Sequence, residues 1–458
     1  MSLLLYNVRI NGEAGYVLIR GNRIEKVGYG SLPDATQRID MKEAELHPGF
    51  CDSHTHLSNV ALMHGTLDLT GLTRDEILGL ISSECGKREV IVGRGWDESF
   101  WDRKEYLTRD ELDAVCDNVP VFLIREDGHI AAVNSAIIRK FGIGDDQGFV
   151  REKDISKLSD LLGVFKTLDF EYAQNYALSK GITCVHDFAS PDTFKKYFLM
   201  RSKGELKVRI YANFYMDSYR FIRELGLYSG FGDPFLRIGA LKLFADGSIG
   251  AKTAATRYLD GKTVKPMINR SKLFSIVREA NSHGVRVFTH AIGDLAIEEV
   301  IGAYSLAGRL HMNRIEHYEL PYEEHMLEGL EVSMQPNFLK WAKEGGLYQM
   351  RLGSEVLFTN NPYRRILDSK MILLFGSDCM PMDPMFGIKM AVGSEYPMQR
   401  ISYSEAVGAY TRGATYMHPL LGKIKEGYIA DLVALDERGI LLTMVDGKIG
   451  YMRKNLNA

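Results

Sequence analysis

The middle of the chain alternates short apolar segments with amphipathic ones, and this alternation restricts the possible folds more than any other feature. In the clearest unit, Ser271 is the expected N-cap of a helix and Gly284 is its expected end. An apolar strand follows at residues 285–289. Similar apolar segments lie at residues 51–53, 182–188, 208–216, 238–244, 314–318, 331–335 and 372–377. Eight strands joined by helices predict an α/β chain folded as a (β/α)8 TIM barrel, with its chemistry at the C-terminal ends of the strands.

The two ends of the chain resemble each other instead of the middle. Short strands are expected at residues 3–10, 16–20 and 23–27, and again at 429–435, 440–445 and 448–452. Neither end has enough apolar residues for a stable sheet of its own. We therefore expect residues 1–49 and 419–458 to pair into one small β-sandwich domain, with the barrel at residues 50–418.

The gap between the first two barrel strands is much longer than one helical crossover. Thr73 with Glu76, and Thr108 with Glu111, have the spacing of a capping box that opens a helix. Each expected helix is followed by a strand, at residues 90–92 and 121–124. These patterns predict an α/β insertion subdomain over residues 60–180.

Charge and cysteine content narrow the class of protein. The 56 basic and 59 acidic side chains are interleaved, which argues against a nucleic-acid binder and favours a small-molecule substrate. No apolar run approaches the roughly 18 residues that a membrane span needs. The five cysteines lack a CxxC spacing, so we expect free thiols in a reducing, cytoplasmic location. A homodimer would be an ordinary assembly for such a chain.

Candidate metal ligands stand at the ends of the expected strands. His54 and His56 follow the first strand, and residues two apart in an extended segment face the same side, so both can bind one metal. The later strands contribute Lys242, His290, His317 and Asp378.

This ordered set strongly resembles the amidohydrolase superfamily, over essentially the whole chain. The motif PGFCDSHTH at residues 48–56 and the closing segment GKIKEGYIADLVAL at 422–435 are similar to the family's first-strand and sandwich signatures. The segments LKLFADGSIG at 241–250, REDGHIAAVNS at 125–135 and THAIGD at 289–294 resemble the branch that includes N-substituted formamide deformylase.

The resemblance implies a metal-dependent hydrolase that cleaves a non-peptide C–N bond in an amide, a formamide-like compound or a cyclic amide. One or two divalent ions are expected, with zinc favoured: His54 and His56 would bind a first, and His290 and His317 a second. A metal-bound hydroxide would attack, and Asp378 would bind the first ion and serve as the acid/base.

Lys242 would be N-carboxylated and bridge two ions, according to the same resemblance. An ammonium about 4 Å from a divalent ion would be repelled by roughly 8 kcal/mol at an effective dielectric near 20. Beside a metal, Lys242 is therefore either a neutral amine or a carbamate. Alternatively, it pairs with Glu316 or Asp246.

Substrate contacts are expected from two regions. Trp96, Trp101, Asp127 and His129 of the insertion could form an aromatic wall with polar hooks at the barrel mouth, or could belong to the insertion's own core. From the barrel, Asp246 and Gln335 face the mouth by their position in the chain. His186 ends the second strand and is interpreted as a core or supporting residue.

Two other functions compete with amide hydrolysis. A mononuclear deaminase of this fold places a proton-shuttling Glu three residues after the fifth-strand His, where this chain has Gly293. A non-enzymatic interaction or regulatory barrel usually lacks one or more ligands, whereas all six positions are filled here. Both alternatives therefore rank below the hydrolase.

Overall fold

The computed structural model describes residues 2–163, 168–308 and 310–454, so the outermost ends of the predicted domains at residues 1 and 455–458 lie outside it. At its centre, eight strands form one parallel sheet in the order β17-β16-β15-β14-β13-β12-β11-β5. The strands are β5 (Phe50–Thr55), β11 (Ile182–Ala189), β12 (Arg209–Tyr215), β13 (Leu236–Phe244), β14 (Val287–Ala291), β15 (Arg314–His317), β16 (Glu331–Met334) and β17 (Ile372–Phe375). The predicted barrel is confirmed.

Hydrogen bonds between its first and last strands close the barrel. The backbone N–H of Asp378 donates to the carbonyl of His54 at 2.8 Å, just beyond β17. The carboxylate of Asp52 accepts from the backbone N–H of Ser377 at 2.9 Å. Closure therefore brings the C-terminal ends of β5 and β17 side by side, although they are far apart in the sequence.

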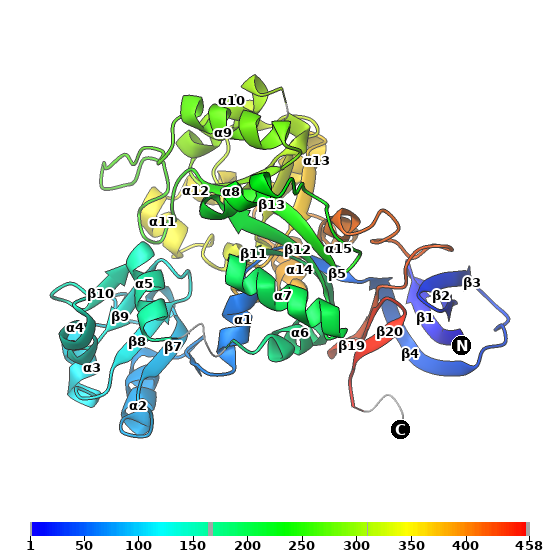
Figure 1. Cartoon of the computed structure of the whole chain (residues 1–458), viewed down its shortest axis with the longest axis horizontal. Helices are drawn as coiled ribbons and strands as arrows, with labels where there is room; N and C mark the ends of the chain where they lie inside the picture. Colours follow the sequence, from blue (N-terminus) through cyan, green and yellow to red (C-terminus); the bar gives the residue numbers. More distant parts are fainter. Residues whose placement is uncertain (1, 164–167, 309, 455–458) are drawn as a thin grey trace. The chain divides into compact units, whose positions relative to one another are not determined.

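Helices follow or flank the strands, and α7, α9 and α10 lie outside the barrel strands in Figure 1. The helices are α1 (Leu57–Met63), α2 (Arg74–Glu84), α3 (Arg109–Val115), α4 (Ser135–Phe141), α5 (Lys153–Leu161), α6 (Phe170–Ser179), α7 (Pro191–Lys203), α8 (Tyr219–Glu224), α9 (Arg270–Ser282), α10 (Asp294–Leu306), α11 (Leu347–Leu352), α12 (Val356–Thr359), α13 (Tyr363–Asp368), α14 (Pro384–Gly393) and α15 (Tyr403–Thr411). Within the described residues, no helix has the length and apolar character needed to cross a membrane.

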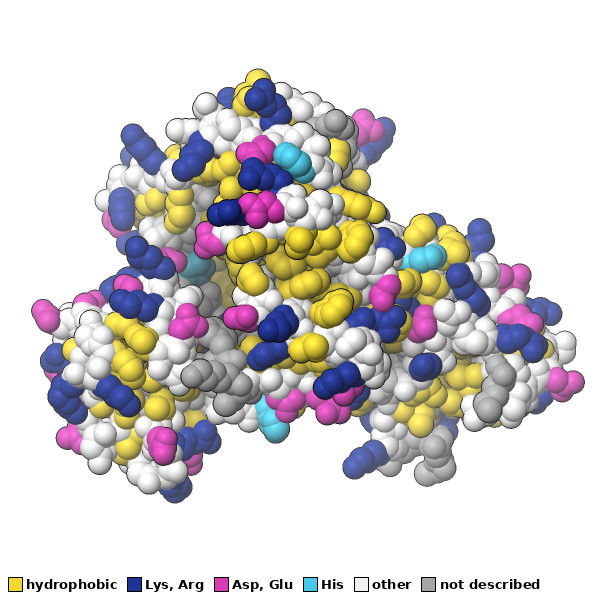
Figure 2. Space-filling view, in the orientation of Figure 1, with side chains coloured by type: hydrophobic (Ala, Val, Ile, Leu, Met, Phe, Trp, Pro, Cys, Tyr) yellow, Lys and Arg dark blue, Asp and Glu magenta, His cyan; other side chains and the backbone are white. Residues whose placement is uncertain are grey.

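Figure 2 shows acidic and basic side chains interspersed on one face of the molecule, with apolar side chains gathered near its centre. On the helices α7 and α8, the side chains of Phe198 and Phe221 are exposed.

The chain ends form one continuous sheet of seven strands, in the order β20-β19-β18-β4-β1-β2-β3. The strands are β1 (Ser2–Ile10), β2 (Glu13–Arg20), β3 (Arg23–Gly28), β4 (Gln37–Pro48), β18 (Leu432–Asp436), β19 (Gly439–Val445) and β20 (Lys448–Met452). The edge strand β3 bonds back to the segment before β18, where the N–H of Ile24 donates to the carbonyl of Tyr428 at 2.9 Å. The curled sheet encloses an apolar core that includes Leu5, Val17 and Leu442.

The strand β4 was not expected from the sequence, yet it joins the two ends of the chain. It pairs in parallel with β1 and antiparallel with β18. Its segment is rich in charged residues, and Lys42 and Glu43 have left-handed backbone at φ 51° and 65°, which interrupts the strand pattern. Alternation of polar and apolar residues is therefore weak where the strand is most needed.

The insertion forms a second compact unit, comprising Ser58–Tyr172 and Gly250–Lys252. Its five-stranded sheet runs in the order β10-β9-β8-β7-β6, with strands β6 (Leu67–Asp68), β7 (Ile91–Trp96), β8 (Val121–Arg125), β9 (Ile130–Val133) and β10 (Phe149–Arg151). Both expected capping boxes are present, at Thr73 before α2 and at Thr108 before α3.

A disulfide corrects one expectation from the sequence. Cys85 and Cys116, which follow the ends of α2 and α3, are bonded to each other, whereas Cys51, Cys184 and Cys379 are free. The expectation of five free thiols is therefore wrong. The odd number and irregular spacing of the cysteines could not reveal the pair, because the packing of α2 beside α3 brings the two residues together.

Candidate metal centre

Two histidines of β5 and the aspartate after β17 converge at one end of the barrel. The Nε2 atoms of His54 and His56 lie 3.7 and 3.3 Å from Oδ1 of Asp378. The two imidazole rings face the same side of the extended segment, with centroids 5.8 Å apart. The side chains of His56 and Asp378 are 23% and 16% exposed, so this corner of the group is open to solvent.

His317 completes a cluster of possible ligand atoms. One ligand atom from each of His54, His317 and Asp378 lies within 4.8 Å of the others. His317 and Asp378 both have left-handed backbone, with φ values of 73° and 50°. Such conformations cost about 1–3 kcal/mol each in a non-glycine residue and concentrate at functional sites. The backbone is therefore strained at the points that aim these two side chains.

The neighbouring strands β13 and β14 contribute Lys242 and His290 to the same region. The ring centroid of His290 lies 4.3 Å from that of His317. The Nζ atom of Lys242 lies 4.1 Å from the centroid of the Phe188 ring. The charge of Lys242 contributes to lowering the pKa of both His54 and His317. The structure thus brings all six predicted ligands to the C-terminal end of the barrel.

The hydrogen-bond partners of three histidines fix which ring nitrogen carries the lone pair. Nδ1 of His54 faces Oε2 of Glu316 at 2.5 Å, and Nδ1 of His317 faces Oε1 of Gln335 at 2.7 Å. Both partners are acceptors, so each Nδ1 carries a proton and each Nε2 a lone pair. In His290, Nε2 faces the carbonyl of Gly247 at 3.1 Å, so the lone pair lies on Nδ1. Each ring can therefore act as a ligand while neutral.

Burial shapes the protonation of the group. It lowers the pKa of His54 and of His317 well below the ordinary value, so both imidazoles are neutral at pH 7. It also lowers the pKa of Lys242 to about 8. Burial opposes ionisation of Asp378, but contacts with its neighbours, including the hydrogen bond from His56 and the charge of Lys242, outweigh it and lower the pKa of this carboxyl below its usual value. Neutral imidazoles beside an ionised carboxylate make up a donor set that fits a divalent cation.

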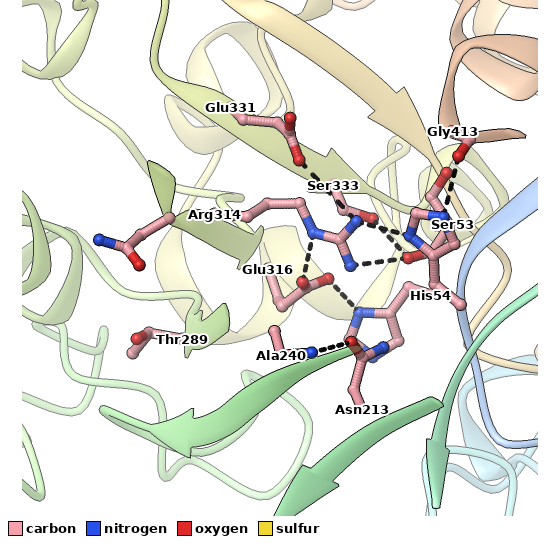
Figure 3. Close-up of polar contacts among 12 residues, drawn as sticks. Ser53, His54, Asn213, Ala240, Thr289, Arg314, Glu316, Glu331, Ser333 and Gly413 are labelled. Carbon is pink, nitrogen blue, oxygen red and sulfur yellow. Dashed lines mark hydrogen bonds and ion pairs between the residues drawn. The ribbon is translucent and has the colours of Figure 1, made fainter. Parts of the chain in front are cut away.

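A buried arginine lies beneath the cluster, and Figure 3 shows it among the partners that it joins. Nε of Arg314 donates to Oε1 of Glu316 at 2.6 Å, and Nη2 donates to the carbonyl of Ser53 at 2.9 Å. Sequence reasoning missed Arg314 as a functional candidate and treated Glu316 only as a possible partner of Lys242. Their spacing in Arg314-Ile-Glu316-His317 was the available signal, because residues two apart in a strand point to the same face.

The barrel residues expected to contact substrate have partners within the protein. Asp246 accepts hydrogen bonds from the backbone N–H groups of Ala255, Gly293 and Ile292, at 2.8 to 3.0 Å. It thereby joins the loop after β13 to the loop after β14. Gln335 is buried and holds His317. Substrate contact remains a prediction for both.

In the insertion, the two tryptophans pack among the insertion's own residues. Trp96 and Trp101 belong to its apolar core, and their Nε1–H groups donate to the carbonyls of Leu123 and Leu72 at 2.9 and 3.0 Å. This agrees with the core alternative that the sequence left open.

The polar residues of the insertion are also engaged. The carboxylate of Asp127 lies 2.9 Å from Nη1 of Arg125 and also accepts from the N–H of His129 at 3.1 Å. The ring of His129 faces Glu152 at 3.1 Å. As substrate contacts, these two residues likewise remain predictions.

A second group of possible ligands, formed by Cys51, Cys184 and His186, has no lone pair to offer from its imidazole. Nδ1 of His186 accepts from Nη1 of Arg314 at 2.9 Å, and Nε2 donates to the carbonyl of Gly413 at 3.0 Å. Burial, with the charge of Arg314, lowers the pKa of His186 to about 3. The ring is therefore a neutral core residue, as the sequence analysis expected.

A closed (β/α)8 barrel with imidazole and carboxylate groups at its C-terminal end provides the side chains that metal-assisted hydrolysis needs. The chain belongs to the amidohydrolase family, whose model matches residues 37–449. It is therefore a hydrolase.

Three relatives illustrate this membership. YtcJ of Bacillus subtilis strain 168, which carries the name of an amidohydrolase, is 29% identical, over 90% of this chain and 87% of its own length. The N-substituted formamide deformylase of Arthrobacter pascens is 26% identical, over 97% of this chain and 96% of its own. The crystal structure of an uncharacterized metal-dependent hydrolase from Pyrococcus furiosus matches with a TM-score of 0.75 and 27% identity, over 95% and 99% of the two chains.

Proposed function

We propose that the protein hydrolyses a carbon–nitrogen bond other than a peptide bond, in an amide, a formamide-like compound or a cyclic amide. The observation that carries the proposal is the cluster of His54, His317 and Asp378, with one ligand atom of each within 4.8 Å of the others. The name of the deformylase relative supports the bond type, and the name of the Pyrococcus relative supports metal dependence.

The ligands divide into two groups by their contacts. His54 and His56 share Asp378 and would hold a first divalent ion, whereas His290 and His317 pack against each other and would hold a second. Zinc is the favoured ion, because the donors are imidazole and carboxylate. A bound ion would supply a Lewis acid and lower the pKa of a coordinated water.

Asp378 is the residue that we assign to proton transfer. Its carboxylate is ionised at neutral pH and is partly open to solvent, so it can accept a proton from the attacking water. The same carboxyl group then returns that proton to the leaving nitrogen when the carbon–nitrogen bond breaks. Nε2 of His56, 3.3 Å from Oδ1, helps to keep the carboxylate in place.

Lys242 would be carboxylated and bridge the two ions. A pKa of about 8 leaves a substantial fraction of this lysine as the neutral amine at pH 7 to 8. The amine nitrogen attacks carbon dioxide, forms the N–C bond and releases a proton, which leaves a carbamate anion. A metal ion would repel the ammonium form of Lys242, whereas it would attract the carbamate anion.

The test is a screen of N-formyl, N-acyl and cyclic amides against protein loaded with zinc, manganese or cobalt. We expect hydrolysis of at least one class, and a loss of about 10²–10⁴ in kcat for Asp378→Asn. Asp192→Asn, on the exposed first turn of α7, is the matched control and should retain activity. Failure to retain about 0.3 equivalents of any of these metals would overturn the proposal, and ammonia release from an amino-substituted ring would favour the deaminase instead.

A further inference from the structure

We propose that Arg314 and Glu316 are positioning residues that hold the proton of His54 on Nδ1 and so direct its Nε2 lone pair toward Asp378 and His317. The inference rests on the proposed metal centre, because it concerns how one of the assigned ligands is prepared. It assigns a function to two residues of β15, Arg314 at its start and Glu316 near its C-terminal end, which Figure 3 draws beside His54.

The first step is the fixed direction of the hydrogen bonds from Arg314. A guanidinium group only donates, so each partner of Arg314 must present a lone pair. Its three nitrogens contact Glu316 through Nε, His186 through Nη1 and the carbonyl of Ser53 through Nη2, at 2.6 to 2.9 Å. Arg314 and Glu316 are both completely buried. Water therefore does not compete for these bonds.

The second step follows from the two oxygens of Glu316. Oε1 accepts from Arg314 and forms an ion pair with it, and Oε2 faces Nδ1 of His54 at 2.5 Å. A carboxylate in an ion pair has only acceptor oxygens, so the shared proton belongs to the imidazole. The opposite nitrogen of His54 then carries the lone pair, 3.7 Å from Oδ1 of Asp378.

The third step is that Arg314 also sets the tautomer of His186, which lies on β11 beside β5 and has the opposite tautomer to His54. Because Nη1 of Arg314 donates to Nδ1 of His186, the proton of His186 lies on Nε2 and is donated to Gly413. His54 of β5 and His186 of β11 thus differ in chemistry because of one buried cation. His54 is prepared as a ligand, and His186 is kept as a structural residue.

Arg314 also holds the backbone immediately before His54. The carbonyl that Nη2 binds belongs to Ser53, the residue immediately before His54. Backbone and side chain of the ligand are therefore held from the same point, and such supporting contacts typically change metal affinity about 10- to 100-fold when removed.

The experiment compares Glu316→Gln with Glu331→Gln. A glutamine at position 316 has only one acceptor oxygen, so its NH2 group must face either Arg314 or His54, and both positions now hold a donor. Glu331 is the matched control, because it is buried at the start of the adjacent strand β16, 4.0 Å from Arg314, and its carboxylate contacts Arg286 and Tyr416.

Two measurements are made on the full chain. Zinc affinity is measured by competition with a chromophoric chelator, and the ring tautomer of His54 is read from the imidazole ¹⁵N shifts of metal-free, histidine-labelled protein, with His54→Gln for assignment. For Glu316→Gln we expect zinc affinity to fall about 10- to 100-fold. We also expect a new population of His54 protonated on Nε2, whereas Glu331→Gln should keep the wild-type tautomer and affinity.

Zinc affinity within about twofold of wild type together with an unchanged tautomer in Glu316→Gln would overturn the proposal. Equal losses in Glu331→Gln would also overturn it, because general loosening of the core would then explain both. If wild type binds no zinc, the proposed function fails, while the tautomer comparison in metal-free protein still decides the positioning role. Should Glu316→Gln not fold, Arg314→Lys replaces it and is expected to redistribute the tautomers of both His54 and His186.

Discussion

Among single residues, His54, His290 and His317 each have a specific hydrogen-bond partner on one ring nitrogen, which leaves the lone pair on the other. For His317 this partner is the amide oxygen of Gln335, which comes from the adjacent strand end. The sequence placed Gln335 correctly at the strand end but could not tell whether its amide turns to the substrate or to a ligand. That choice depends on side-chain rotamers in the packed core, which no sequence spacing encodes.

Replacement of Gln335 separates these two roles. If Gln335 mainly holds His317, Gln335→Ala should weaken zinc binding by about 10- to 100-fold, as measured by chelator competition. Gln335→Glu retains an acceptor for Nδ1 and should keep most of the affinity. A rise in KM with unchanged zinc affinity would instead favour direct contact with substrate.

At the scale of elements, the helix signals were reliable in kind but not always in position. Ser271 was expected to cap α9, but the cap is Asn269, whose side chain accepts from the N–H of Lys272. Asparagine and serine are equally good N-caps, so a sequence with both offers two starting points. The two capping boxes of the insertion had only one candidate each, and both are confirmed.

The second capping box gives a prediction for pH. Burial opposes ionisation of Glu111, but Arg74 and the groups of Thr108 outweigh it and lower the pKa of this carboxyl. A lowered pKa means that the ionised form stabilises the fold above the unfolded pKa, and that this contribution is lost as pH falls through the folded pKa. Glu111→Gln should therefore reduce the hydrogen-exchange protection of α3 at pH 7, with a smaller difference near pH 3.

Glu76→Gln, in the equivalent capping box of α2, is the control. Only the groups of Thr73 lower the pKa of Glu76, because no arginine contributes there. Its effect should be smaller than that of Glu111→Gln. Equal effects at both positions, or an effect of Glu111→Gln that does not depend on pH, would contradict the role given to Arg74.

The disulfide of the insertion gives a prediction about thiols. In denaturant, an alkylating reagent should modify three cysteines before reduction and five after it, as counted by mass spectrometry. Loop closure over a sequence separation of 31 residues corresponds to about 3–4 kcal/mol of stability for the insertion. Cys85→Ser with Cys116→Ser should lower that stability and leave zinc content unchanged, whereas five reactive thiols without reduction would refute the bond.

At the scale of the whole chain, the terminal sheet is joined to the barrel by a buried ion pair. Arg209, at the start of β12, donates from Nε and Nη2 to the two oxygens of Asp431, at 2.7 and 2.8 Å. Both side chains are buried. Burial alone would lower the pKa of Arg209, but the hydrogen-bonded carboxylates of Asp431 and Asp446 outweigh it and raise this pKa above its ordinary value. The contact lies at the N-terminal end of the strand, opposite to the ligands.

Removal of one partner from this pair should be costly. Asp431→Asn leaves a buried guanidinium without its full counter-charge, and we expect a loss of about 3–5 kcal/mol in the free energy of unfolding. The measurement is urea denaturation of the zinc-free protein. Asp34→Asn, which removes an exposed partner of Arg38 in the same sheet, should leave the midpoint almost unchanged. Similar midpoints for the two variants would show that the buried pair does not couple sheet to barrel.

The barrel, the pairing of the two chain ends and the strand end that carries each candidate ligand could all be predicted from the sequence, because apolar periodicity and strand-end position are local properties. Three features became visible only in the folded chain: β4 joins the chain ends, Cys85 is bonded to Cys116, and Arg314 holds both Glu316 and His186. These features depend on contacts between segments far apart in the chain. A buried polar group needs a hydrogen-bond partner, but the fold decides which distant segment supplies that partner, and spacing along the sequence does not indicate it.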